Sequence, residues 1–364
     1  MNHDKPPQNL GAEDPELENI LAAMKSPEER KAQETAARID ELLDGFEATI
    51  RQDMSSRTEH LGLSDHDAQT LPTQIIHEMR AEFKNLAYMS DPAIAQRCVD
   101  GIKEEMLEAC LSYLDRWRQK ELAENKDPKR IQVIESEFAQ ARENAKSRIG
   151  GYVKADILEI LELKLKGTLD PQSAEMAILE SMGANRGYNG SYHVYSQRIQ
   201  IPLWSHLSLA RMRGVVAHEY THAGFHKKGS GDDFATFLAV TLHLAPETEP
   251  QRSARREEIT SIANVYLMYD ESFAFQVERL GNYDSSDKVP FAKYGVDTGA
   301  FKAIYNMIGV LLNKKTLEQI DRIIKRFSDY FLNEAKRAIT NKLSAVDFNS
   351  AAMGKLQEIA EAEV

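Results

Sequence analysis

One segment of the sequence has the residue types and spacing of a catalytic metal site. It contains two histidines four residues apart, with a glutamate directly after the first. They are His218 and His222, with Glu219 between them, and they give the pattern HExxH. Residues four apart lie one turn above each other on a helix, so both imidazoles can reach the same metal ion. Zinc is the ion that this pattern favours, and it lowers the pKa of a bound water towards about 7. The pattern therefore predicts Zn²⁺ as a cofactor.

Glu219 follows the first histidine directly, so we expect its carboxylate to point beside the metal rather than at it. From there the carboxylate can take a proton from the water and later return it to a leaving amine. The apolar run at 214–217 supplies a face that would bury this helix in a core. These features predict a metallopeptidase in which Glu219 is the general base.

The third protein ligand has to come from outside the motif, because a catalytic zinc typically has three such ligands and a water. Glu271 is the preferred candidate: its segment is strongly helical, and Ala274, one turn on, is small enough for close approach to the histidines. A carboxylate in this apolar setting is costly to bury unpaired, which favours a metal or cationic partner. His226 is the alternative third ligand, although Gly224 and the glycines after His226 indicate that the helix ends there.

The HEYTH segment and a downstream helix with E-x-x-A at 271–274 together resemble the gluzincin group of zinc metallopeptidases. The E-x-x-A helix is also similar to that of lethal-factor-type bacterial toxin and effector peptidase domains. The resemblance covers roughly residues 190–280 and implies a zincin-like fold. It further implies that Glu219 is the general base. The zinc ligands that it implies are His218, His222 and Glu271. The metzincin pattern is excluded, because Phe225 and Lys228 stand where it needs glycine and histidine.

Peptide hydrolysis also needs a hydrogen-bond donor for the oxyanion of its transition state. Five tyrosines downstream of the motif are candidates between which the sequence does not choose: Tyr266, Tyr269, Tyr283, Tyr294 and Tyr305. Asp270 and Glu278 are candidates for holding a zinc-bound histidine in the correct tautomer. His226, if it is not a ligand, is a candidate for orienting the site or for capping the helix.

The elements that must position these residues are almost all helices. From about 18 to 168, leucine, isoleucine and alanine recur at spacings of three and four among charged residues. This periodicity predicts a helical N-terminal region, with breaks at Gly62 and ahead of Pro92 and Pro128. Its charge runs are interpreted as solvated faces rather than binding sites.

A short β segment is expected directly ahead of the HExxH helix. Tyr192, Val194, Ile199 and Ile201 alternate with polar residues, which predicts a half-buried hairpin or edge strand. An extended peptide could add to such a strand by pairing with its backbone. Helices are expected to resume after 205 and again at about 233–245, 256–280, 298–313, 316–341 and 348–362.

The predicted fold class is therefore mainly α with a small β-sheet (α+β), in which a helical N-terminal region precedes a zincin-like catalytic domain. We expect a disordered leader at 1–17, the helical region at 18–168, the metallopeptidase domain at 169–345 and a C-terminal helix at 346–364.

The composition of the 364 residues, 42% hydrophobic and 28% charged, is typical of a globular protein. A net charge of −12 repels phosphate backbones, so nucleic acid is not expected as a partner. No apolar run approaches the roughly 18–20 residues of a membrane span, so no membrane partner is expected either. The two cysteines, Cys98 and Cys110, are expected to be free buried thiols.

The first residues are polar and acidic and lack the apolar core of a secretory signal, so we expect the protein to be made in the cytoplasm. Export as an effector by a non-classical route fits the resemblance to toxin domains. An intracellular housekeeping peptidase fits the same residues equally well.

Three functions are compatible with the sequence. The preferred one is a zinc metalloendopeptidase acting on a protein or peptide substrate. The second is a zincin-like domain that binds a metal or a partner without hydrolysis, against which the intact Glu219 argues. The third is a helical interaction protein with an accidental motif, which predicts no stoichiometric metal. The cleavage specificity and the oligomeric state do not follow from the sequence.

Overall fold

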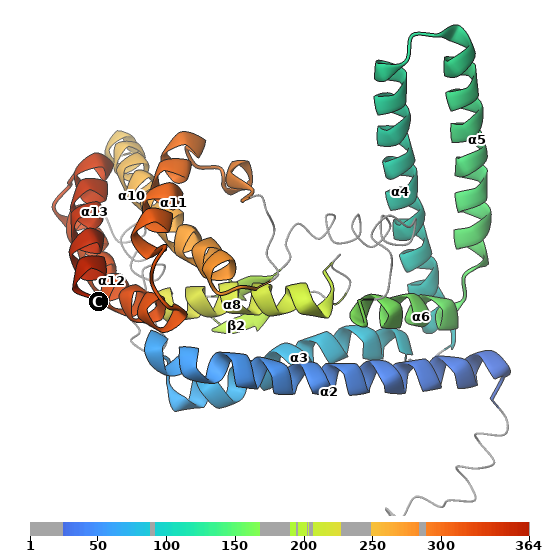
Figure 1. Ribbon diagram of the computed structural model, residues 1–364, viewed down its shortest axis with the longest axis horizontal. Coiled ribbons are helices and arrows are strands. Elements are labelled where there is room, and N and C mark those ends of the chain that lie inside the picture. The colour runs from blue at the N-terminus through green and yellow to red at the C-terminus, as the bar shows by residue number, and fades with distance from the viewer. Residues whose placement is uncertain are drawn as a thin grey trace, which may run out of the picture. The chain divides into compact units, whose positions relative to one another are not determined.

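The fold of the described residues is mainly helical with one small sheet (Figure 1). A computed structural model of the chain describes residues 25–87, 92–167, 190–193, 196–201, 203, 207–226, 249–283 and 289–363. The prediction of a mainly α fold with a small β-sheet is confirmed at this level. The expected leader at 1–17, the expected helix at 233–245 and Val194 lie outside the described residues. Within them, no helix combines the length and the apolar character that crossing a membrane demands.

The helices of the N-terminal half are α2 (Pro27–Leu61), α3 (Asp65–Ala87), α4 (Pro92–Glu124), α5 (Pro128–Gly151) and α6 (Lys154–Leu165). Residues that disfavour helix set their limits. Gly62 follows α2 with a φ of +72°, a conformation that side chains rarely adopt. Asp127 caps α5 by accepting a hydrogen bond from the backbone of Lys129. The breaks expected at Gly62 and ahead of Pro128 are therefore confirmed.

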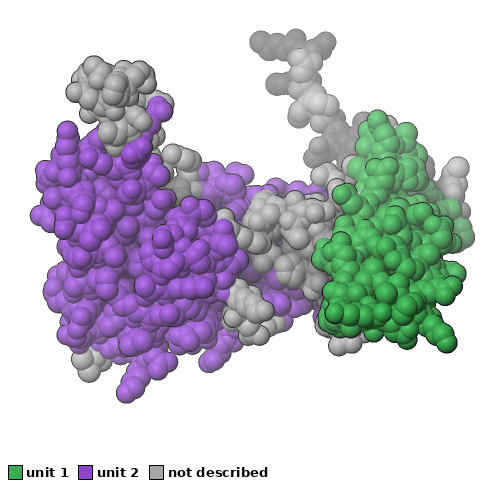
Figure 2. Space-filling view, turned by 90° about the horizontal axis from the view of Figure 1, so that it is seen from above, with its two compact units in different colours: residues 1–41, 84–163 green, residues 42–83, 164–364 purple. Residues whose placement is uncertain are grey.

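By their contacts, the residues divide into two compact units, which Figure 2 shows in two colours. Unit 1 comprises residues 1–41 and 84–163, and unit 2 comprises residues 42–83 and 164–364. The domain limits expected from the sequence stay predictions.

In unit 1, α4 and α5 pack against each other (Figure 1). Between them the ring of Phe138 lies 5.2 Å from the guanidinium carbon of Arg118 and 5.4 Å from that of Arg142. Both cysteines lie on α4 as free thiols; Cys110 is buried, as expected, whereas Cys98 is only half-buried.

The sheet belongs to unit 2 and consists of β1 (Ser191–His193) and β2 (Arg198–Gln200), which pair antiparallel. The hairpin expected in this segment is confirmed. On the side of β2 away from β1, the side chain of Gln74 on α3 accepts a hydrogen bond from the backbone N–H of Ile199 at 3.1 Å. The same amide donates to the carbonyl of Ile199 at 3.0 Å. At this residue a helix side chain therefore takes the place of a further strand.

The remaining elements of unit 2 are α8 (Leu209–His226), α10 (Glu249–Leu280), the 3-10 helix η1 (Phe291–Tyr294), α11 (Thr298–Leu312), α12 (Leu317–Thr340) and α13 (Ala345–Ala362). The helix α10 contacts α8, α11, α12 and α13. An aromatic core fills the space between these helices, and its rings belong to Phe225, Tyr266, Phe327, Phe331 and Phe348. This core fixes α8 and α10 side by side, and the candidate site lies between these two helices.

Candidate metal centre

The helix α8 carries the HExxH residues into the interior of unit 2. All side chains at 216–225 are buried, because α10, α12 and β1 pack around the helix. At Gly224 the helix also meets Leu61 of α2, and an added Cβ would stand 2.8 Å from the Cδ2 of Leu61. Buried polar side chains need partners, so the neighbours of the two histidines show what the site is built to bind.

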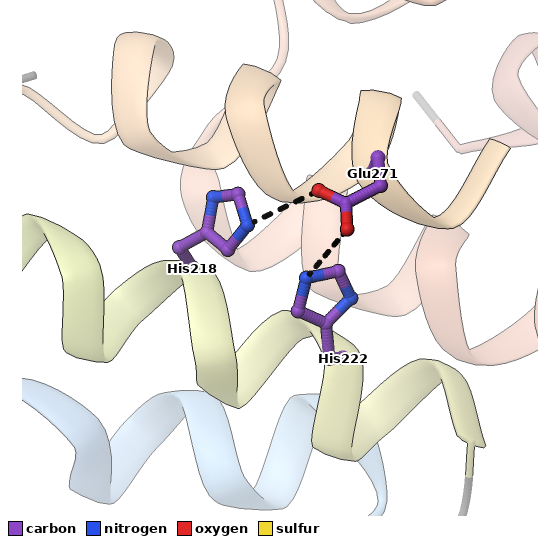
Figure 3. A group of neighbouring side chains, drawn as sticks. All are labelled: His218, His222 and Glu271. Atoms are coloured by element: carbon purple, nitrogen blue, oxygen red, sulfur yellow. Dashed lines mark ion pairs between the residues drawn. The ribbon is translucent and has the colours of Figure 1, made fainter. Parts of the chain in front are cut away.

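His218, His222 and Glu271 converge on one point (Figure 3). The two imidazole rings lie 4.8 Å apart between centroids. From α10, Glu271 places Oε2 3.5 Å from Nε2 of His218 and Oε1 3.8 Å from Nε2 of His222. Zinc bonds of about 2.1 Å hold tetrahedral ligand atoms about 3.4 Å apart. The three side chains therefore fit one zinc ion after small shifts, in the arrangement that the sequence predicted.

Within the protein the carboxylate of Glu271 is only partly satisfied, by a hydrogen bond with Tyr294. Its distances to the two rings exceed those of a well-formed hydrogen bond, which is about 2.7–3.2 Å long. Its buried Oε2 has no hydrogen-bond partner among the residues that the structure describes. A buried anion in this situation is costly unless a cation joins it.

The other nitrogen of each ring meets a second carboxylate from α10. Asp270 Oδ1 forms a hydrogen bond of 2.8 Å with Nδ1 of His222, and Glu278 Oε1 makes an ion-pair contact of 2.8 Å with Nδ1 of His218. A carboxylate at Nδ1 keeps the ring proton there and leaves Nε2 to a metal. Asp270 thus lies where its predicted role as a histidine-orienting group requires, whereas Glu278 approaches Nδ1 of His218 without a well-directed hydrogen bond.

These carboxylates alter the proton affinities of the site. Burial favours a neutral imidazole, but Asp270 and Glu271 outweigh burial and raise the pKa of His222 to about 9. Burial also acts to lower the pKa of His218, but Glu271 and Glu278 outweigh it and raise this pKa well above its usual value. Burial acts to raise the pKa of Glu271, but the charge of His222 and the hydrogen bond and charge of His218 together outweigh it and lower this pKa. The site therefore attracts positive charge, which protons supply when no metal is bound.

Glu219 lies buried beside the two rings. Burial raises the pKa of its carboxyl group, and its Oε2 has no hydrogen-bond partner among the described residues. Gly190, which precedes β1, approaches so closely that an added Cβ would stand 3.1 Å from Glu219 Oε1 and 2.4 Å from Val215 Cγ1. A carboxylate with raised proton affinity and an uncommitted oxygen is suited to general-base chemistry.

Among the five candidate tyrosines, Tyr294 is the one that contacts the predicted zinc ligands. Its ring packs edge-on against Phe275 and Phe301. Burial, the charge of Glu271 and a hydrogen bond to Glu271 raise the pKa of Tyr294, so its hydroxyl remains a donor at neutral pH. The other candidates have different neighbours: Phe331 for Tyr266, Asn349 for Tyr269, Arg57 for Tyr283 and Phe291 for Tyr305.

His226, the alternative third ligand, is the last residue of α8 and faces Asp270 rather than Glu271. Its Nε2 lies 2.8 Å from Asp270 Oδ2. With His222 it forms a separate group of possible metal ligands whose donor atoms lie within 4.8 Å of one another. The geometry thus separates His226 from the group formed by the motif and Glu271.

Arg57 of α2 forms hydrogen bonds with α8. This residue was not among the site residues predicted from the sequence. Its guanidinium donates to the carbonyl oxygen of Ala217 at 2.7 Å and to the hydroxyl of Thr221 at 2.9 Å. It also forms a two-bonded ion pair with Asp321 of α12, with both bonds 2.9 Å long. Since Ala217 and Thr221 each directly precede one of the motif's histidines, this contact fixes the helix that carries them.

Comparison of the chain with protein-family models, with curated proteins and with solved structures found no match. A function can therefore be inferred only from the geometry and chemistry of this site.

Proposed function

We propose that the chain is a zinc-dependent metalloendopeptidase with a zincin-like catalytic domain, acting on protein or peptide substrates. His218, His222 and Glu271 would hold the zinc ion, and Glu219 would act as the general base. One observation carries the proposal. The donor atoms of two histidines and a carboxylate lie within 4.8 Å of one another, and a buried glutamate with an unpartnered oxygen lies beside them.

The residues of the site divide the chemistry between them. When bound, zinc polarises a substrate carbonyl and lowers the pKa of a water. Glu219 takes a proton from the attacking water and returns it to the amine as it leaves. Tyr294, whose hydroxyl donates to Glu271 in the structure, would donate instead to the oxyanion that develops at the former carbonyl. Asp270 keeps the imidazole of His222 turned with Nε2 towards Glu271, and the charge of Glu278 favours a proton on Nδ1 of His218.

The position of β1 supports a peptide as the substrate. Extended peptides bind proteins by adding a strand to a sheet. Gly190 brings the start of β1 against Glu219, so a peptide that lies along β1 passes the general base. The opposite edge of the sheet is less suited, because Gln74 occupies the backbone N–H and carbonyl of Ile199 there.

The first test is the zinc content per chain, measured by elemental analysis on the purified protein. We expect near-stoichiometric zinc in the wild type and its loss in Glu271→Ala. Glu257→Ala is the matched control, because Glu257 is an exposed glutamate on the same helix. A wild type that takes up no zinc even after incubation with the metal contradicts the proposal. Zinc that is held as tightly in Glu271→Ala as in the wild type would move the third ligand to His226.

The second test separates hydrolysis from mere metal binding. A peptide library is incubated with the wild type and with Glu219→Gln, and mass spectrometry then detects new peptide ends. We expect cleavage by the wild type, its inhibition by a chelator, and its loss in Glu219→Gln although zinc is retained. If both proteins hold zinc and neither cleaves any peptide, the zincin-like domain that binds without hydrolysis becomes the better account.

A further inference from the structure

The histidines of α8 face three acidic residues of α10, two of which, Asp270 and Glu271, each lie between two of the rings. His218, His222 and His226 follow one another at intervals of four residues, so they form a row along one face of the helix. Asp270 and Glu271 are consecutive and therefore project from α10 in different directions. Glu271 faces the first two rings of the row. Asp270 faces the second and third, with distances of 2.8 Å to Nδ1 of His222 and to Nε2 of His226.

The group around Asp270 has the composition of a zinc site. Two imidazole nitrogens and a carboxylate are typical zinc ligands, and here the three donor atoms lie within 4.8 Å of one another. The side chains of His222, His226 and Asp270 are only 9%, 14% and 5% exposed. The Nδ1 of His226 is buried without a hydrogen-bond partner among the described residues. Asp270 thus makes the one hydrogen bond that the described residues give this ring.

The charge around the histidines also favours a second cation. Four carboxyl groups from two helices gather at this point, and they belong to Glu219, Asp270, Glu271 and Glu278. One zinc ion balances two negative charges. A second divalent ion at Asp270 would offset part of the remainder inside a buried region, where uncompensated charge is costly.

We propose that His222, His226 and Asp270 form a second zinc site, weaker than the one at Glu271. The two sites share His222, whose Nε2 faces Glu271 and whose Nδ1 faces Asp270. Two ions bind together only if this imidazole gives up both N–H protons and bridges them, which makes the second ion harder to bind. The hydrogens that now join His222 and His226 to Asp270 leave as protons to the solvent, as ligand protons do when a metal binds.

Occupation of the second site has a consequence for the first. Asp270 can then no longer hold the Nδ1 proton of His222, and the loss of such an orienting contact lowers zinc affinity or activity about 10–100-fold. Excess zinc should therefore inhibit peptide hydrolysis. This regulatory effect rests on the proposed function, whereas the second binding event does not.

The test is a zinc-binding isotherm of the metal-stripped, full-length chain, measured by equilibrium dialysis and elemental analysis. We expect the wild type to bind two zinc ions, the second at least about tenfold more weakly than the first. His226→Gln should bind one ion tightly, and Glu271→Gln should lose the tight ion and keep the weak one. His66→Gln, an exposed histidine on α3, is the matched control and should bind as the wild type does.

The outcomes separate this inference from the proposed function. A wild type that saturates with one ion, which Glu271→Gln then loses, overturns the second site and leaves the first intact. Two ions bound by His226→Gln also overturn it. If His226→Gln fails to fold, a Co²⁺ titration of the wild type decides the question through visible absorption. Two successive changes in the spectrum support the second site, and a single change refutes it.

Discussion

Neutralising Asp321 should lower the free energy of unfolding, because Asp321 forms a buried ion pair with Arg57. Arg57 and Asp321 share two bonds of 2.9 Å, and their side chains are 2% and 0% exposed. Asp321→Asn preserves the size of the side chain but leaves the guanidinium buried without its counter-charge. Removing one partner of a buried ion pair costs about 3–5 kcal/mol. Because Ala217 and Thr221 still accept hydrogen bonds from the guanidinium, we expect the lower end, about 3 kcal/mol.

Thermal unfolding followed by circular dichroism measures this loss. About 3 kcal/mol corresponds to a fall in Tm of about 6–12 °C for a large domain. Asp53→Asn is the matched control, since Asp53 pairs with Arg213 between α2 and α8, but their side chains are 18% and 43% exposed. Such a pair contributes about 0–1 kcal/mol, so its loss should lower Tm by at most about 4 °C. Equal shifts in the two variants would show that burial of the Arg57–Asp321 pair does not make it more important than a more exposed pair.

A double variant then tests whether Arg57 also positions the metal ligands. Replacing a buried ion pair by apolar residues of similar volume is often neutral or stabilising, so Arg57→Met with Asp321→Leu should recover much of the stability. The carbonyl of Ala217 and the hydroxyl of Thr221 nevertheless lose their common donor. We expect zinc affinity to fall about tenfold in this variant, on the scale of other indirect changes at metal sites. Unchanged zinc affinity would show that Arg57 contributes only to stability.

Three further predictions concern the site itself. Tyr294→Phe should lower kcat about 10²–10³-fold at unchanged zinc content, as expected when an oxyanion donor is removed; a steady-state kcat within about twofold of the wild type would place the donor elsewhere. Gly190→Ala brings a methyl group against Val215 and Glu219, so cleavage should slow while elemental analysis finds zinc retained, and full activity would contradict the close approach. The pKa of His222 is raised to about 9, so the stability that its protonation adds to the metal-free protein is fully present below about pH 6.5 and lost as the pH rises through about 9. Denaturant midpoints measured across this range should therefore fall, and a rise would contradict the assignment.

The parts of the site that the sequence could predict depend on local geometry. His218 and His222 share a helix face because of their spacing alone. Asp270 and Glu278 could be proposed as orienting groups because they lie on the same predicted helix as Glu271, one and seven residues away. Which carboxylate meets which ring depends on how α8 packs against α10, and only the structure supplies this.

Tyr294 could not be separated from the other tyrosines by sequence. It lies 23 residues after Glu271, beyond the end of α10, in a short 3-10 helix that has no helical repeat to reveal its direction. Its place is set by the packing of its ring against Phe275 and Phe301. Contacts of this kind follow from the path of the chain and leave no periodic signal.

Arg57 is a different case, because its position within a periodic row of apolar residues can be recognised in the sequence. Along α2 the buried residues recur at intervals of three and four: Ile39, Leu43, Phe46, Ile50, Met54 and Leu61. Arg57 occupies the position in this apolar row between Met54 and Leu61, and it is only 1% exposed. Arginine is almost never fully buried unless it is paired, so a charge within an apolar row requires an acidic partner somewhere in the chain. The sequence alone could have predicted that a partner exists, but its identity as Asp321, 264 residues away, depends on the fold.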